Sequence, residues 1–316
     1  MSDLQTPEVF REVLESLKIG VCIVDRERKI VFWNDGAEEI SGYPRQEVLG
    51  RPCREGLLVH FDENNAELRD HACPILAAMH DGQPREVQVY LHHKTGYPVP
   101  VNVHAFPIRD VQGQVIGAAE SFEEGQRAST QRIPGSDLAV GHGLDAATRL
   151  PDHDFTELYL SGRLKFATEH TIPFGLLCIM LDQLEEFRVT HGAVAAETIL
   201  NVAAHTLGNG PDPLDFLGRW SDNQFLAIVA NCDANALQAT GEQLKRLMSC
   251  AGITWWGDAL SVTVSVGATA IKPGETLDLL VERLAAALQE SVLGGGNRVT
   301  VLSAQEVDEE PGSAGH

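Results

Sequence analysis

The chain of 316 residues is long enough for about two domains, and 43% apolar residues with few aromatics are ordinary for a globular protein. A formal net charge of −21 makes nucleic acid and anionic membrane surfaces poor partners. No basic-then-apolar leader and no apolar run long enough to span a bilayer occur in it, which predicts a soluble cytoplasmic protein. The six cysteines are scattered without CxxC pairs, so we expect them to be mostly reduced and buried.

Residues 1–18 predict a short N-terminal helix. Its apolar residues recur at helical spacing and share one face; they are Val9, Phe10, Val13, Leu14 and Leu17. An apolar face at this place in a chain packs on the domain that follows or on a partner chain. We therefore expect a homodimer formed through this helix and the domain after it.

Residues 19–124 predict an antiparallel sheet with helices on one face. Two strands form a hairpin, short helical pieces follow, and three more strands close the domain. The strands are expected at 20–25, 30–34, 86–92, 99–108 and 115–122, and the last helix at 73–80. This order of elements is typical of an α+β domain.

Many small matches in the right order make this domain similar to a PAS domain. They lie at Gly20, Val24-Asp25, Trp33-Asn34, Ala37, residues 40–43, 47–50, 94–96 and 107–110, Gly113 and Gly117. The resemblance implies a module that binds a small ligand or cofactor, or that serves in dimerisation.

Four side chains are candidates for holding a ligand of this domain: Cys53, His60, His71 and Cys73. All fall in the part that we expect to be helical, where a PAS ligand would sit. Thiol and imidazole groups suit iron, zinc or haem, but the spacing matches no standard metal motif. The other interpretation is buried thiols and surface histidines. We favour the second and expect a colourless, metal-free protein.

Residues 125–144 predict a flexible linker. The segment is rich in glycine and polar residues, and Pro134-Gly135 should interrupt any helix that entered it. A continuous coiled coil between two domains is therefore not expected.

Residues 145–302 predict an α/β domain. A wholly apolar run at 174–181 is suited to a central buried strand, and residues 216–229 predict a hairpin. The other expected elements are a helix after Phe155, a helix up to Leu207, a helix at 236–248, an alternating strand at 260–270 and a helix at 276–293. Residues 303–316 are acidic and rich in Gly, Ser and Pro, which predicts a disordered tail.

This domain resembles the GGDEF family, the bacterial diguanylate cyclases with a nucleotidyl-cyclase-like fold. Residues 145–155 resemble the family's entry motif, Asp-x-Leu-Thr-Gly-Leu-Pro-Asn-Arg-x-x-Phe. Residues 262–267, Val-Thr-Val-Ser-Val-Gly, resemble its Val-Thr-Val-Ser-Ile-Gly strand. Arg219 and Phe225 flank the hairpin as in the family's Arg-Tyr-Gly-Gly-Asp-Glu-Phe.

The four chemical positions of that hairpin carry other residues here. Ser221, Asp222, Asn223 and Gln224 stand where the family has Gly-Gly-Asp-Glu. The glycines let the backbone approach phosphates closely, and the family's third position is a metal-binding carboxylate. Asp222 adds a negative charge beside a polyanion, and Asn223 is neutral. The resemblance therefore implies a vestigial hairpin without a catalytic residue.

Other positions at which the family binds nucleotide are also altered. Where active members hold Mg²⁺ with two aspartates, this chain keeps Asp182 and has Leu184, so only a weak Mg²⁺ site is expected. The guanine-reading asparagine is missing, and Glu197 is a candidate stand-in for the second guanine-reading residue. We take Asp182, Glu197 and Arg219 as the vestige of a GTP site.

Phosphate-binding cations are missing from the matching positions. Gln289, Val292 and Gly296 stand for the family's tyrosine, phosphate-binding lysine and arginine. Asp212 replaces the arginine of the inhibitory Arg-x-x-Asp site, although Asp215 is kept. Residues 294–296, three glycines, predict a turn before the last strand rather than a phosphate cradle.

Two functions follow from these resemblances. The first is a signalling protein in which a PAS sensor is joined to a degenerate GGDEF domain that acts by association or weak nucleotide binding. The second is an active diguanylate cyclase, with Mg²⁺ and GTP bound at an unusual hairpin site. We favour the first, because several losses coincide.

Overall fold

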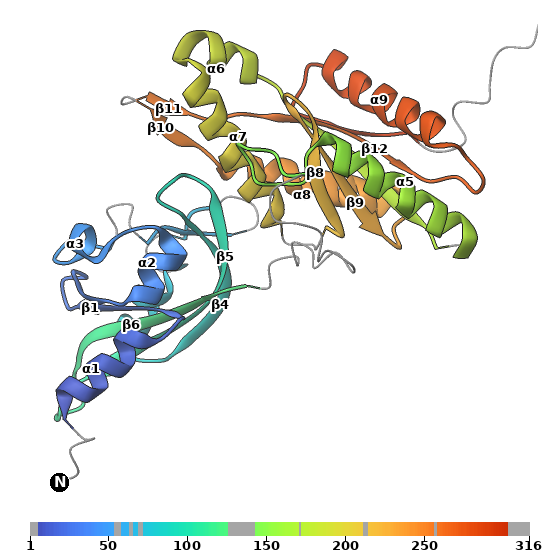
Figure 1. Ribbon diagram of the computed structural model, residues 1–316. Helices are drawn as coiled ribbons and strands as arrows, with labels where there is room; N and C mark the ends of the chain where they lie inside the picture. Colours follow the sequence, from blue (N-terminus) through green and yellow to red (C-terminus); the bar gives the residue numbers. More distant parts are fainter. Residues whose placement is uncertain are drawn as a thin grey trace, which may run out of the picture. The chain divides into compact units, whose positions relative to one another are not determined.

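The computed structural model describes residues 6–53, 58–62, 66–68, 72–125, 143–170, 172–210, 214–255 and 258–302. The chain divides into two compact units, residues 1–127 and 128–316, each built on its own sheet (Figure 1). Across the described ranges no helix combines the length and the apolar composition needed to cross a membrane. The expected linker and tail fall almost wholly outside the described residues, so those two expectations stay predictions.

An antiparallel sheet forms the first unit, in the strand order β2-β1-β6-β5-β4-β3. Its strands are β1 (Gly20–Asp25), β2 (Ile30–Trp33), β3 (His60–Phe61), β4 (Arg85–His92), β5 (Pro98–Arg109) and β6 (Val115–Glu124). Its helices are α1 (Pro7–Ser16), α2 (Asp35–Ser41), α3 (Arg45–Val48) and α4 (Pro74–Asp81). The α+β architecture predicted for this part of the chain is confirmed.

A buried asparagine holds the start of this unit together. The side chain of Asn34 caps α2 by accepting from the Ala37 amide at 2.9 Å, and it also accepts from the Val21 amide at 2.7 Å. Its amide group donates to the carbonyls of Leu14, Leu17 and Ile19. Asn34 therefore joins the end of α1, the strand β1 and the start of α2.

The expectation about His60 is wrong in two respects. His60 lies in the strand β3 rather than in a helical segment, and it is buried rather than on the surface. The reason is a two-residue pairing with β4, in which His60 lies opposite Leu91. Such a short strand has no periodicity that a sequence can show. Cys53 is buried in the turn after α3, Cys73 precedes α4, and His71 lies outside the described residues.

Helix α1 contributes nothing to the core of this unit. Thr6 caps its start and Pro7 occupies its first turn, so the predicted helix is confirmed. None of its residues is buried, and the side chains of Phe10 and Val13 are 57% and 53% exposed. The apolar face predicted from the sequence is therefore present. Val9, Leu14 and Leu17 on it are half-buried, whereas Phe10 and Val13 are exposed.

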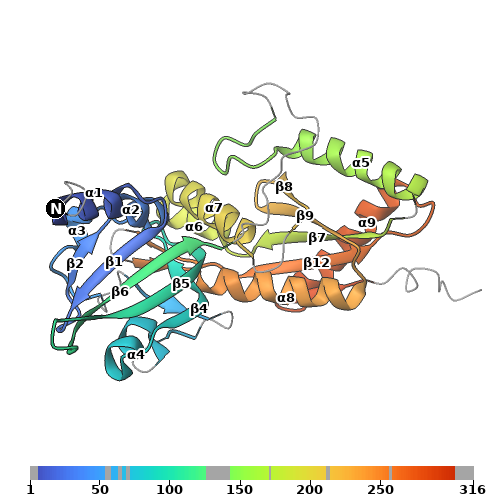
Figure 2. The same cartoon turned by 90° about the horizontal axis from the view of Figure 1, so that it is seen from below.

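The second unit is an α/β domain with the strand order β13-β12-β7-β9-β8. Its strands are β7 (Phe174–Leu181), β8 (Phe216–Ser221), β9 (Gln224–Ala230), β12 (Val264–Ala270) and β13 (Val299–Val301), with a separate pair, β10 (Ile253–Trp255) and β11 (Asp258–Leu260). Its helices are α5 (His153–His170), α6 (Leu184–His191), α7 (Ala193–Gly208), α8 (Ala234–Cys250) and α9 (Leu277–Leu293). Helices α5 and α9 cover one face of the sheet and α8 the other, with α7 against α8 (Figure 2).

One expected strand is wrong in its extent and in its pattern. The sequence predicted a single alternating strand at 260–270, whereas β11 ends at Leu260 and β12 begins at Val264. Residues 264–269 are all buried instead of alternating. The reason is that β12 is an interior strand, with α9 and α8 packed on its opposite faces.

Helix α9 lies directly against the backbone of β12. A Cβ atom added at Gly267 would lie 2.2 Å from the backbone nitrogen of Leu288. No side-chain rotation can relieve a clash with backbone atoms, so the glycine sets how closely this helix approaches the sheet.

We expect Gly267→Ala to lower the free energy of unfolding of the second unit by about 2 kcal/mol or more, because α9 must move away from β12. Gly162→Ala is the matched control. Gly162 lies in the middle of α5 with nothing within 4 Å of an added Cβ, so this change should stabilise by about 0.5–1 kcal/mol. Calorimetry of the two variants measures both effects, and equal melting temperatures would contradict the packing argument.

Candidate functional site

The hairpin between β8 and β9 is closed by a two-residue turn, Asp222-Asn223. Ser221 and Gln224 are paired across it. The carbonyl of Asn223 accepts from the Leu181 amide at 2.9 Å, and the Asn223 side chain donates to the Leu181 carbonyl at 3.5 Å. The neutral amide at the family's metal position thus contacts the backbone of β7.

Arg219 makes its contacts with neighbouring groups of the same domain. Its guanidinium lies 4.8 Å from the ring centroid of Phe225 and donates to the Asp222 carbonyl at 2.8 Å. Its Nε lies 3.8 Å from the carboxylate of Asp145, and its backbone amide donates to the Pro151 carbonyl at 2.8 Å. Burial lowers the pKa of this guanidinium from its usual value. Arg219 thus fastens the hairpin to the entry segment.

Both carboxylate oxygens of Asp182 accept hydrogen bonds from the chain. Ser265 Oγ donates to one oxygen at 2.6 Å, and Thr263 Oγ1 donates to the other at 2.6 Å. The backbone amide of Asn297 also donates to the second oxygen, at 3.2 Å. The carboxylate therefore joins the end of β7 to the start of β12 and to the turn before β13.

The oxygen ligands that remain at the family's metal site do not fit a magnesium ion. Mg²⁺ prefers charged oxygens in octahedral geometry, whereas Asn223 is neutral and Asp182 already receives three donors. Leu184, at the family's second aspartate position, is buried in the core. The described part of the chain contains no group of three or more His, Cys, Asp or Glu residues arranged to hold a metal ion.

Two other predicted site residues lie elsewhere. Glu197 is exposed on α7, and none of its described contacts joins it to the hairpin. The carboxylate of Asp215 accepts from the Ala230 amide, where β9 ends. Asp212 lies outside the described residues.

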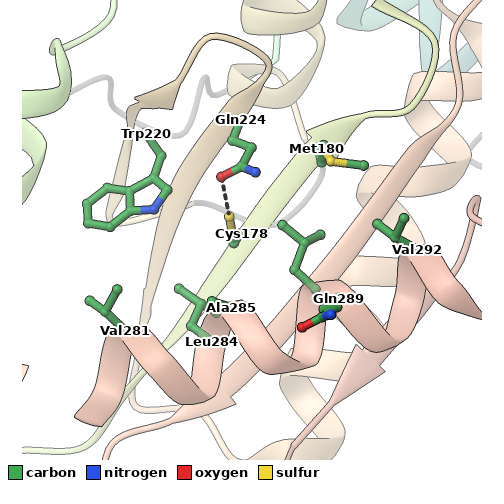
Figure 3. A pocket seen from close by; sticks show the side chains of 10 residues that line it. Cys178, Met180, Trp220, Gln224, Val281, Leu284, Ala285, Gln289 and Val292 are labelled. Atoms are coloured by element: carbon green, nitrogen blue, oxygen red, sulfur yellow. Dashed lines mark hydrogen bonds between the residues drawn. The ribbon is translucent and has the colours of Figure 1, made fainter. Parts of the chain in front are cut away.

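A pocket of about 270 Å³ lies beside the hairpin (Figure 3). Trp220 and Gln224 of the hairpin stand on one side of it, α9 forms the other, and β7 lies between them. Its lining consists of Cys178, Met180, Trp220, Gln224, Val281, Leu284, Ala285, Leu288, Gln289 and Val292. None of these residues carries a charge at neutral pH.

The polar atoms of this pocket are few and neutral. The thiol of Cys178 donates to Gln224 Oε1 at 3.6 Å, and burial raises the pKa of that thiol to about 12. Gln289 and Val292, at the family's tyrosine and lysine positions, both line the pocket. The surface where the family places phosphate-binding groups is thus largely apolar here.

Sequence reasoning missed three residues of this region. Thr263 and Ser265 were read as scaffold within the Val-Thr-Val-Ser motif, although their hydroxyls hold Asp182. Trp220, to which the sequence assigned no role, lines the pocket. The one available signal was two hydroxyl residues at alternate positions of the strand expected at 260–270, which need polar partners where they are buried.

Comparison with known families agrees with both units. Residues 18–124 match the model of the PAS domain, and residues 142–298 match the model described as "Diguanylate cyclase, GGDEF domain". The chain is a PAS–GGDEF protein. This agrees with the antiparallel sheet of the first unit and the α/β sheet of the second.

Curated relatives of this PAS–GGDEF protein include several named as diguanylate cyclases. The "Probable diguanylate cyclase DgcE" of Escherichia coli is 24% identical over 96% of this chain and 27% of its own length. "Diguanylate cyclase A" of Treponema denticola is 28% identical over 40% of this chain and 34% of its own length. The chain thus spans about a third or less of the length of these two relatives. Among solved structures, the GGDEF domain of DgcB from Caulobacter crescentus in complex with c-di-GMP is 25% identical over 52% of this chain and 98% of that one, with a TM-score of 0.49.

We expect Asp182→Ala to lower the free energy of unfolding of the GGDEF unit by about 2–3 kcal/mol. The buried hydroxyl of Ser265, the half-buried hydroxyl of Thr263 and the amide of Asn297 all lose this acceptor. Asp222→Ala, at the exposed tip of the β8–β9 hairpin, is the control and should stay within about 0.5 kcal/mol of the unchanged protein. Millimolar Mg²⁺ should raise the melting temperature of neither protein. A melting temperature that rises with Mg²⁺ in the unchanged protein and not in Asp182→Ala would instead identify Asp182 as a metal ligand.

Proposed function

We propose that this PAS–GGDEF protein is a signalling protein whose GGDEF domain acts by association with other proteins, without making cyclic di-GMP. One observation carries the proposal. The pocket beside the hairpin, where the family places a phosphate-binding lysine, is lined by apolar side chains and two amides.

The chemistry of cyclisation explains why this lining matters. Diguanylate cyclases join two GTP molecules, and the attacked phosphates carry charge that the protein must neutralise. Here Val292 lies at the lysine position, and the exposed Asp222 adds negative charge at the hairpin. Each missing contact of this kind costs roughly 3 kcal/mol of transition-state stabilisation.

The backbone of the hairpin and of the turn at Gly296 also disfavours triphosphate binding. A glycine pair would let a triphosphate approach the hairpin, whereas Ser221 and Asp222 both project exposed side chains there. Gly296, at the family's arginine position, has φ of +72° and lies against Asp182. A longer side chain at this position would strain the backbone, so the turn itself is built for glycine.

The second candidate is an active diguanylate cyclase. Its support is the match to the probable cyclase of Escherichia coli over nearly the whole chain, together with the retained Asp182 and Arg219. Weak nucleotide binding is compatible with either candidate, because amide and acidic groups occupy the hairpin.

Incubation of the full chain with GTP and Mg²⁺ should yield no cyclic di-GMP by chromatography. GTP should bind no tighter than about millimolar, near −4 kcal/mol, since both the phosphate cations and the guanine-reading asparagine are missing. A cyclase with the intact family motif serves as the positive control.

Restoring the hairpin alone should not create turnover. The combined change Ser221→Gly, Asp222→Gly, Asn223→Asp and Gln224→Glu leaves Leu184 and Val292 in place, so metal and phosphate would still lack partners. Product made by the unchanged protein, and lost in the isosteric variant Asp182→Asn, would establish the second candidate instead.

The expected homodimer belongs to the same proposal. Phe10 and Val13 on the apolar face of α1 are exposed, and a second copy of the chain would cover them. Phe10→Asp combined with Val13→Asp should convert a dimer at tens of micromolar into a monomer in light scattering. Glu12→Gln, an exposed change on the same helix, should leave the dimer intact. A monomeric mass for the unchanged protein would show that α1 does not serve this purpose.

A further inference from the structure

A carboxylate lies in the core of the PAS unit. Glu120 occupies the middle of β6 and is 0% exposed. It lies opposite Cys22 of β1 on one side and Ala105 of β5 on the other. Ala118 and Phe122, two residues away on either side, belong to the apolar core of the unit. The alternation of β6 therefore directs Glu120 inward.

The imidazole of His60, a group that can carry a positive charge, lies beside this carboxylate and is 2% exposed. Its Nε2 lies 3.2 Å from Glu120 Oε1, in a geometry that makes no hydrogen bond. His60 Nε2 and both carboxylate oxygens of Glu120 have no hydrogen-bond partner among the described residues. The great majority of buried polar atoms in proteins have a hydrogen-bond partner. A buried carboxylate without donors costs folding free energy.

Among the described residues, the cysteines near Glu120 are poor donors. Cys22, Cys53 and Cys73 are close enough for the charge of Glu120 to raise their pKa values, although burial is the larger cause in each. They therefore stay neutral thiols, which are weak donors. The residues that flank Glu120 in the sheet, Cys22 and Ala105, are small and wholly buried. The described groups that border this carboxylate therefore bond to it poorly.

We propose that Glu120 is the anchor of a ligand site inside the PAS unit, which takes a small organic cation with N–H donors: an amidine, a guanidine or a protonated amine. An ionised carboxylate accepts two parallel N–H bonds from such a group, and the opposite charge offsets the cost of burial. His60 lies beside the same carboxylate. This site concerns the first unit and does not depend on whether the GGDEF domain is catalytic.

A metal ion fits this site less well than an organic cation. The described residues offer no group of three or more potential ligands in metal-binding arrangement, here or elsewhere. The other arrangement open to the chain is a closed ion pair between protonated His60 and Glu120, with no ligand. The two arrangements differ in what happens when an external cation is added.

The test uses acetamidinium chloride as the probe and the full chain after unfolding and refolding, so that any ligand carried through purification is removed. Melting temperature is measured with millimolar probe, against equimolar sodium chloride to match the ionic strength around this acidic protein. Acetamide, which is neutral and nearly isosteric, is the second control. We expect the amidinium to raise the melting temperature by about 2 °C or more, and acetamide to leave it unchanged.

Three variants locate the effect. Glu120→Gln should abolish the shift, because the amide keeps the shape of the carboxylate and loses its charge. Glu123→Gln, on an exposed position of the same strand, should keep it. His60→Gln should keep or enlarge it, because the imidazole that lies 3.2 Å from the carboxylate, and that can compete with an added cation, is then gone. This last variant tests the proposal even where Glu120→Gln does not fold.

Absence of a shift in both the unchanged protein and His60→Gln would overturn the proposal in favour of a closed ion pair. An equal shift in Glu120→Gln would also overturn it, because the probe would then bind elsewhere. Mass spectrometry of small molecules released from freshly purified protein should identify a nitrogen-rich cation that is missing from Glu120→Gln.

Discussion

The carboxylate of Asp182 is the point at which three segments of the GGDEF unit meet. It ends the central strand β7, receives hydroxyl donors from Thr263 and Ser265, and accepts the amide of Asn297. The hairpin is tied to the same end of β7, because Asn223 and Leu181 bond through their backbones. The position of the hairpin relative to the last turn of the domain therefore depends on an acidic group that is occupied by the chain itself.

These hydrogen bonds of Asp182 bear on whether its match to a metal-binding aspartate of the family implies a metal site here. A carboxylate can hold a metal ion only if its oxygens are free, or if its present donors can be displaced at small cost. Here displacement would remove the acceptor of the buried Ser265 hydroxyl and one of the two acceptors of the Thr263 hydroxyl. The apolar pocket beside the hairpin has the same character, since Cys178, Trp220 and Val292 form a surface suited to side chains rather than phosphates. Structure and charge thus support the proposal that this domain keeps the family scaffold and acts by association.

In the PAS unit, one buried polar side chain is fully hydrogen-bonded and another is not. Asn34 shows how this fold satisfies a buried polar side chain, since its oxygen and its amide nitrogen both have backbone partners. Glu120 and His60 lie in the same core without such bonds. Within one small domain, a fully bonded asparagine and an unbonded carboxylate mark the difference between a structural group and a group available to a ligand.

The sequence by itself determined most strands and helices of the two units and the family of each unit. Strand alternation, helical spacing and turn residues are local signals, so runs such as Phe174–Leu181 and Thr276–Leu293 were placed almost to the residue. It also showed which charges are missing at the hairpin. The two-residue strand β3, the break before Val264 and the continuous burial of β12 depend on neighbours distant in the chain, and only the tertiary structure decided them. The same holds for the partners of Asp182, for the apolar pocket and for the pairing of His60 with Glu120. A residue's type sets which bonds it can form, but packing sets which partners lie within reach.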